Sequence, residues 1–155
     1  GGLTMAIITP PSGSGSGSGT GSVAAGFGAL VLPDTGGVIS YASGTGGLLD
    51  YGAYSEIENS LAQDSYVIGI AHGVTNTTAG AAQIDIATGA AASEVVQYTQ
   101  AVPKYQTANE GLYIPIVPLF IAAGSRIAVR IADTGSSALT YTLTLSIIPA
   151  TNYPV

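Results

Sequence analysis

Charged side chains are scarce in this chain, which has three basic and nine acidic residues among 155. A typical soluble domain carries about 25% charged residues, whereas this sequence carries 8%. The ionic coat that normally keeps a free monomer apart from its neighbours is therefore missing. We infer that much of the surface lies against other protein, as in a component of an assembly.

Cysteine is absent and histidine occurs once, at His72. The lack of cysteine excludes disulfides, thiolate nucleophiles and Cys-ligated metals. A single imidazole leaves only carboxylate-rich calcium or magnesium sites for metal chemistry, and no cofactor is predicted. Three Lys and Arg residues are too few for the basic cluster that nucleic-acid binding requires.

Long apolar runs are missing as well. The longest, residues 112–123, contains two prolines and falls short of the roughly 20 residues that a membrane span needs. The N-terminus also lacks the basic region of a secretory signal. We therefore predict neither a nucleic acid nor a membrane as a partner.

A low-complexity stretch, SGSGSGSGTGS at residues 12–22, contains no side chain that a core can bury. It divides the sequence into an N-terminal arm and linker, residues 1–22, and a β-sandwich domain, residues 23–155. The arm is either a disordered tail or a segment that adds a strand or an apolar plug to a neighbouring subunit. The second reading predicts partner binding by the apolar residues Leu3, Met5, Ile7, Ile8, Pro10 and Pro11.

Alternation with a period of two residues dominates the rest of the chain. Residues 141–147 place four large side chains on one face and Thr or Ser on the other, and residues 126–131 place both arginines outward. Residues 66–70, 83–86 and 94–98 are three further predicted strands, and residues 23–49 contain one or two more. Residues 74–80 have the composition of a hairpin connection. Pro115 and Pro118 predict an edge strand or a crossing loop, because proline donates no ladder hydrogen bond.

About eight short strands with frequent turns predict an all-β fold, an antiparallel jelly-roll-like β-sandwich with an extended N-terminal arm. No convincing helical stretch is present.

Few residues offer catalytic chemistry. We expect His72 to be a hydrogen-bonded histidine at a strand end, because no nucleophile-elbow sequence accompanies it. An acidic cluster formed by Asp50, Glu56, Glu58 and Asp64 favours a solvated edge, with a calcium site or a glycoside hydrolase centred on Glu56 and Glu58 as alternatives. The nine tyrosines suit strands and interfaces and also suit sugar binding. No catalytic residue and no metal ligand is predicted.

Two segments resemble virion proteins of tailed phages. Residues 82–96, AQIDIATGAAASEVV, are similar to a strand, Gly-rich turn and strand in these proteins, and residues 121–130, IAAGSRIAVR, are similar to a segment that follows it. Residues 54–70 resemble their opening strand pair. One position departs from the pattern, where Ala122 replaces the usual proline. The resemblance covers about residues 52–149 and implies a β-sandwich in a capsid decoration protein, a head-fibre base or a tail component.

Composition and resemblance together predict a non-enzymatic phage structural protein. The expected role is a capsid cement or decoration protein that stabilises the head by binding the major capsid protein and sits on the capsid surface as a homotrimer. A tail or fibre adhesin that binds host surface glycans through its tyrosines is the alternative.

Overall fold

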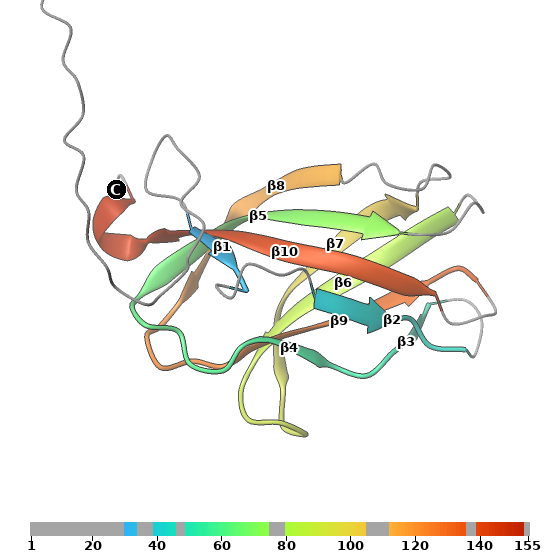
Figure 1. Cartoon of the computed structure of the whole chain (residues 1–155), viewed down its shortest axis with the longest axis horizontal. Coiled ribbons are helices and arrows are strands. Elements are labelled where there is room, and N and C mark those ends of the chain that lie inside the picture. The colour runs from blue at the N-terminus through green and yellow to red at the C-terminus, as the bar shows by residue number, and fades with distance from the viewer. Residues whose placement is uncertain are drawn as a thin grey trace, which may run out of the picture.

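The computed structural model describes residues 30–33, 39–45, 49–74, 80–104, 112–135 and 139–153. The strands that these residues form are β1 (Leu30–Leu32), β2 (Ile39–Ala42), β3 (Asp50–Tyr51), β4 (Ser55–Glu58), β5 (Ser65–Val74), β6 (Gly80–Thr88), β7 (Val95–Lys104), β8 (Leu112–Ile121), β9 (Ile127–Asp133) and β10 (Thr140–Pro149). A single 3-10 turn, η1 (Ala150–Asn152), follows β10 (Figure 1). No helix of this described part has the length and hydropathy of a membrane span.

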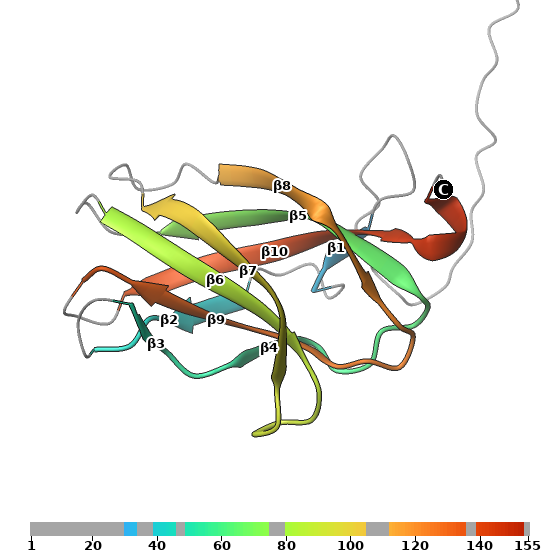
Figure 2. The ribbon, with the colours of Figure 1, turned by 180° about the vertical axis from the view of Figure 1, so that it is seen from behind.

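Two antiparallel sheets face each other across one core. Sheet 1 has the order β1-β10-β5-β8, and β2 continues the β1 edge along β10; sheet 2 has the order β3-β9-β6-β7, and β4 continues the β3 edge along β9. Each sheet is thus four strands wide, with connections that pass between the sheets (Figure 2). This is the jelly-roll arrangement predicted from the sequence.

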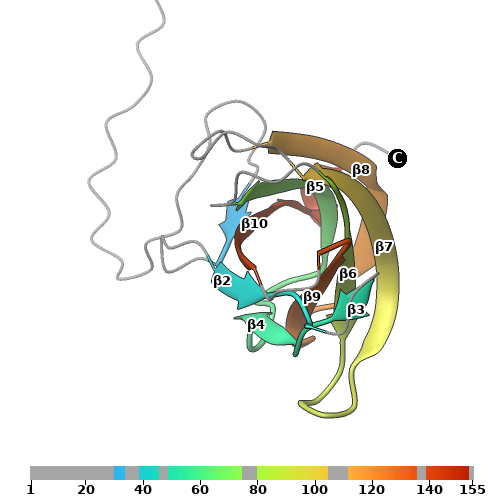
Figure 3. The same cartoon turned by 90° about the vertical axis from the view of Figure 1, so that its right-hand side faces the viewer.

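The alternation within β9 and β10 sets the core, as predicted. Tyr141, Leu143, Leu145 and Ile147 of β10 are buried, and the inward residues of β9 face them from the other sheet. The end view in Figure 3 shows the strands of both sheets around this interior. Burial of each large aliphatic side chain contributes about 1.5–3 kcal/mol, so these two strands supply much of the hydrophobic stabilisation.

Asp133 is a buried polar link between the sheets. This β9 carboxylate accepts hydrogen bonds from the Tyr141 hydroxyl of β10 at 2.7 Å, from the Ser43 hydroxyl at 3.1 Å and from the Gly135 backbone N–H at 2.6 Å. Asp133 is 1% exposed. Because a buried carboxylate is tolerated only when it is well hydrogen-bonded, this arrangement fixes how the ends of β9 and β10 lie.

The inward-facing positions of β5 shift by one residue in the middle of the strand. Ile147 of β10 pairs with Val67, whereas Ser146 pairs with Gly69, so that Ile68 forms a β-bulge. The bulge puts Val67 and then Ile70 and His72 on the inner face.

The predicted hairpin at residues 74–80 is wrong. Residues 75–79 lie outside the described residues, but β5 pairs with β10 and β8 while β6 pairs with β7 and β9. The connection therefore crosses from sheet 1 to sheet 2. The hairpin of this region is β6–β7, whose turn contains Gly89 at φ +116, a conformation that L side chains rarely adopt.

Candidate interaction surface

Charge is segregated between the two sheets. The five strands of sheet 1 contain no Asp, Glu, Lys or Arg. The described charged residues all belong to sheet 2 or to loops: Asp50, Glu56, Glu58, Asp64, Asp85, Glu94, Lys104, Arg126, Arg130 and Asp133. Sheet 1 is therefore the side of the sandwich whose strands carry no charge.

The outer face of sheet 1 is built from small or uncharged side chains. Thr142, Thr144 and Ser146 project outward from β10, because the residues between them are buried. They pair across with Gly73, Ala71 and Gly69 of β5. An uncharged face of this kind offers no ionic group that contact with another protein would have to desolvate.

Large apolar side chains emerge along β8, the edge of this sheet. Val117 is 74% exposed, Tyr113 51% and Phe120 50%. We call these three residues the β8 patch. Aromatic residues are enriched in protein interfaces because they bury a large area at a low cost in conformational entropy, so the patch has the composition of a contact surface.

Neighbouring rings and glycine hold the aromatic residues of the patch in place. A Cβ atom at Gly69 would collide with the ring and hydroxyl of Tyr113, so this ring lies across β5 at the glycine. The Phe120 ring meets Tyr66 edge-on at 5.5 Å between centroids, and Tyr66 packs on Tyr153 at 4.5 Å. Both exposed rings therefore pack against residues of β5.

The prolines of β8 act as the sequence predicted. β8 is an edge strand, and three of its residues, 116–118, stand against one residue of β5, because Pro115 pairs with Gly69 and Leu119 with Val67. Prolines and bulges blunt edge strands against uncontrolled pairing. Since β8 carries no charge, these two prolines and the bulge are the features that disrupt the edge of β8 with which no described strand pairs.

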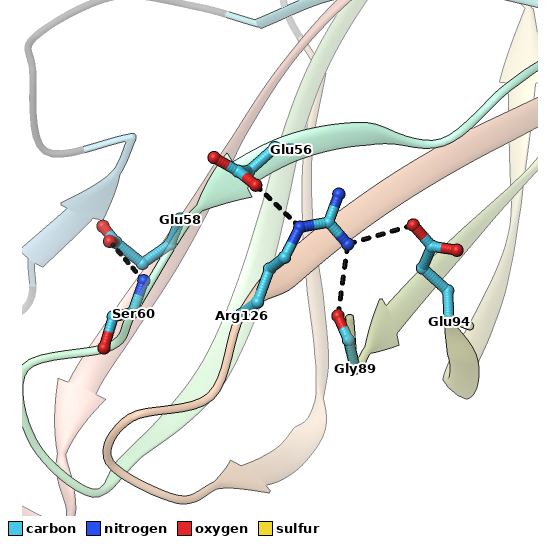
Figure 4. A network of polar contacts seen from close by, with 6 residues as sticks. All are labelled: Glu56, Glu58, Ser60, Gly89, Glu94 and Arg126. Atoms are coloured by element: carbon cyan, nitrogen blue, oxygen red, sulfur yellow. Dashed lines mark hydrogen bonds and ion pairs between the residues drawn. The ribbon is translucent and has the colours of Figure 1, made fainter. Parts of the chain in front are cut away.

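In sheet 2, both arginines form ion pairs with acidic side chains. Arg126, which precedes β9, contacts Glu56 of β4 at 2.6 Å, Glu94 at 3.0 Å and the Gly89 carbonyl at 3.2 Å (Figure 4). The hydrogen bond that Arg126 donates to the Glu56 carboxylate is the largest contribution that raises the pKa of Arg126. The pKa of Glu94 is lowered, first by its own backbone N–H and then by Arg126. Arg126 thus anchors the β6–β7 turn to β4.

A second cluster covers the outer face of sheet 2. The buried Asp85 carboxylate accepts hydrogen bonds from Arg130 at 2.8 Å, from the Thr99 hydroxyl at 2.7 Å and from the Tyr51 hydroxyl at 3.2 Å. The Arg130 guanidinium lies 4.1 Å from the centre of the Tyr51 ring and 4.7 Å from that of Tyr54. Burial raises the pKa of both tyrosines. Both tyrosine rings are therefore already in contact with Arg130.

The structure corrects the prediction for His72. Its side chain is inside the sandwich, 3% exposed, and neither ring nitrogen has a hydrogen-bond partner. Burial lowers the pKa of this imidazole. The residues paired with it are Leu143 of β10 and Leu112 of β8, which offer no nucleophile to activate.

The predicted acidic cluster is dispersed among separate structural roles. Glu56 pairs with Arg126, Glu58 accepts the Ser60 N–H at 3.1 Å, and Asp64 accepts the Ala123 N–H at 2.8 Å. The described residues contain no group of three or more His, Cys, Asp or Glu side chains placed to hold a metal ion.

The arm residues predicted to bind a partner, Leu3, Met5, Ile7, Ile8, Pro10 and Pro11, lie outside the described residues. The β8 patch was not predicted as a site. Its sequence signal was the run from residue 112 to 121, which combines large apolar residues with two prolines and no charge.

Comparisons with known proteins give only distant likenesses. No family model matches the chain, and no curated protein matches its sequence. A structure of infectious bursal disease virus, Gt strain, is 14% identical and matches 81% of this chain and 33% of its own, with a TM-score of 0.44. A crystal structure of the same virus's particle is 16% identical over 81% of this chain and 32% of its own, also at 0.44. The chain thus spans about a third of these proteins, and the likeness assigns no function.

Proposed function

We propose that this chain is a non-enzymatic structural protein of a virion, and specifically a capsid cement or decoration protein of a tailed phage. The observation that carries the proposal is the complete absence of charged residues from the five strands of sheet 1, together with the exposed β8 patch. Three large exposed apolar side chains along one strand of an uncharged sheet favour a surface that other protein covers. The role of such a protein is to bind, and its partners are the major capsid protein and copies of itself.

The segments that resemble phage virion proteins meet in the fold, which supports the virion assignment. Arg126 of the second segment contacts Glu94 of the first, and Arg130 of the second contacts Asp85 of the first. Each basic residue of the later segment thus has an acidic partner in the earlier one. The resemblance therefore rests on residues that build the fold, and it brings no catalytic group with it.

The proposal extends to oligomeric state and location. We place the sandwich on the outer surface of the head as a homotrimer, with residues 1–22 serving as an arm and linker that attach it to a neighbour. Residues 23–155 form the sandwich domain in this proposal. Attachment through uncharged surfaces predicts binding that is insensitive to ionic strength, because there are few surface charges for salt to screen.

Purified particles provide the test. Mass spectrometry of the virions and a copy count from cryo-electron microscopy are expected to show this chain in hundreds of copies over the head. A handful of copies at the tail would support the adhesin instead, and absence from particles would overturn the virion proposal.

The second candidate is a tail or fibre adhesin that binds host surface glycans. It is favoured by the half-exposed rings of Tyr113 and Phe120, since sugar rings stack on such platforms. Tyr51 and Tyr54 are less suited, because Arg130 stacks on both. Retention on a glycan array that is lost in Tyr113→Ala would favour this candidate over the cement protein.

A further inference from the structure

The β8 patch combines exposed apolar area with a position at the edge of a sheet. Six large hydrophobic side chains are exposed among the described residues, and half of them are Tyr113, Val117 and Phe120. The outer edge of β8 is hydrogen-bonded to no described strand. We propose that this patch receives the apolar arm segment, residues 3–9, of a second copy of the chain. This inference rests on the proposed function and names the contact by which one subunit attaches to the next.

Matching charge supports the arm as the occupant. Residues 1–29 contain no Asp, Glu, Lys or Arg, and neither does any strand of sheet 1. Their contact would bury no ion, so the desolvation penalty that opposes the burial of charged groups does not arise. The arm also repeats an apolar residue at every second position, Leu3, Met5 and Ile7, which places three apolar side chains on one face of an extended segment.

The length of chain before the described residues allows the arm to reach a second copy. Leu30, the first residue of β1, pairs with Ile147 of β10. Ile147 pairs with Val67 of β5, which pairs with Leu119 of β8. Three strand spacings of about 4.8 Å place Leu30 about 14 Å from the patch edge of its own sheet. Residues 10–29 extend to about 65 Å, which reaches the β8 patch of a neighbouring subunit as well as that of the same chain, and the disulfide trap described below distinguishes the two.

The prolines of β8 determine the kind of contact. Pro115 and Pro118 have no backbone N–H to offer to an added strand, and residues 116–118 leave the regular ladder. A continuous hydrogen-bonded ladder with the arm is therefore ruled out at these positions. The arm is held mainly by burial of its apolar side chains against Val117 and the two rings, which is an apolar version of strand addition at a sheet edge.

The absence of native cysteine allows the contact to be mapped by disulfide trapping in the full chain. One preparation carries Ile7→Cys and a second carries Val117→Cys, so that each molecule has a single thiol. The matched control acceptor is Val95→Cys, whose native valine is 60% exposed at the start of β7. The two preparations are mixed under mild oxidation over a range of concentrations, and the cross-linked heterodimer is measured against each homodimer.

We expect the yield of the heterodimer linking positions 7 and 117 to exceed that linking positions 7 and 95 by several-fold, and Phe120→Ala on the acceptor to reduce it. Equal yields at both acceptors, or no heterodimer at any concentration, would overturn the inference. A chain carrying both Ile7→Cys and Val117→Cys that closes only on itself would also overturn it. These failures are separate from failure of the proposed function, because presence in virions is measured independently of the trap.

Discussion

Arg126 and Glu94 lie 32 positions apart in the sequence and meet at 3.0 Å, with the Glu94 side chain 7% exposed and that of Arg126 15% exposed. The same guanidinium binds Glu56, whose side chain is 47% exposed. One arginine therefore joins the β8–β9 loop, β4 and the β6–β7 turn (Figure 4). The contact to Glu94 is the more protected of its two ion pairs.

Replacement of Arg126 tests this anchor. Arg126→Met should lower the thermal unfolding midpoint more than Glu56→Gln does, because it leaves the well-covered Glu94 carboxylate without its cation whereas Glu56 remains open to water. Differential scanning fluorimetry gives the midpoints. Hydrogen exchange should show faster opening of residues 89–94 in Arg126→Met, and unchanged exchange there would contradict the anchoring role.

The Arg130 and Asp85 pair supports a prediction about buried charge. Arg130→Met should destabilise the domain by about 3 kcal/mol, because it leaves Asp85 buried without its cation. The double variant Asp85→Leu with Arg130→Met should recover much of that loss, since hydrophobic replacement of a whole buried pair is often tolerated. Urea unfolding of the four proteins in this cycle measures the coupling. Equal losses of stability in Arg130→Met and in the double variant would show that Asp85 does not depend on Arg130.

The two faces of β10 give a matched pair of substitutions. Leu143 is 1% exposed, so Leu143→Asp should unfold the domain, because an unpaired buried carboxylate costs several kcal/mol against a total stability of roughly 5–15 kcal/mol. Thr144 points outward, and Thr144→Asp should leave the thermal midpoint of the free subunit nearly unchanged. Circular dichroism with heating distinguishes the two, and similar midpoints would mean that the inward and outward faces are misassigned.

His72 predicts how stability depends on pH. Burial lowers the folded-state pKa of His72 below its ordinary value of 6.5, so the unfolded chain binds a proton at a higher pH than the folded chain. The contribution of neutral His72 is therefore complete above pH 6.5 and declines as the pH falls from 6.5 towards the folded-state pKa. Urea midpoints across this window should drop in the native protein and drop less in His72→Leu. Parallel curves for the two proteins would refute the assignment.

The sequence predicts the strands with regular alternation and misses the places where regularity fails. In β10, Leu143 and Thr144 fall on their predicted faces because no bulge interrupts that part of the strand. In β5, the bulge at Ile68 moves His72 to the inner face, and no residue pattern announces a bulge of this kind. The prolines of β8 predicted an edge strand or a crossing loop, and the structure shows the edge strand; the missing N–H is a local property of the residue and could be read from the sequence.

Connections and surfaces depend on which strands share a sheet, and this was hidden in the sequence. Turn-forming residues at 74–80 predicted a reversal but could not distinguish a hairpin from a crossing between sheets. The uncharged strands were visible one at a time, yet only the pairing of β5 with β8 and β10 shows that they form one side of the molecule. The arm residues, from Leu3 to Pro11, stay a prediction.

We propose that this protein associates through sheet 1, and sedimentation velocity of charge variants measures that association. We expect the native chain to form trimers with increasing concentration, Val117→Asp to sediment as a monomer, and Val95→Asp, which places the same charge at a similarly exposed site on sheet 2, to behave like the native chain. A native chain that is monomeric throughout, or equal loss of association in both variants, would contradict the account.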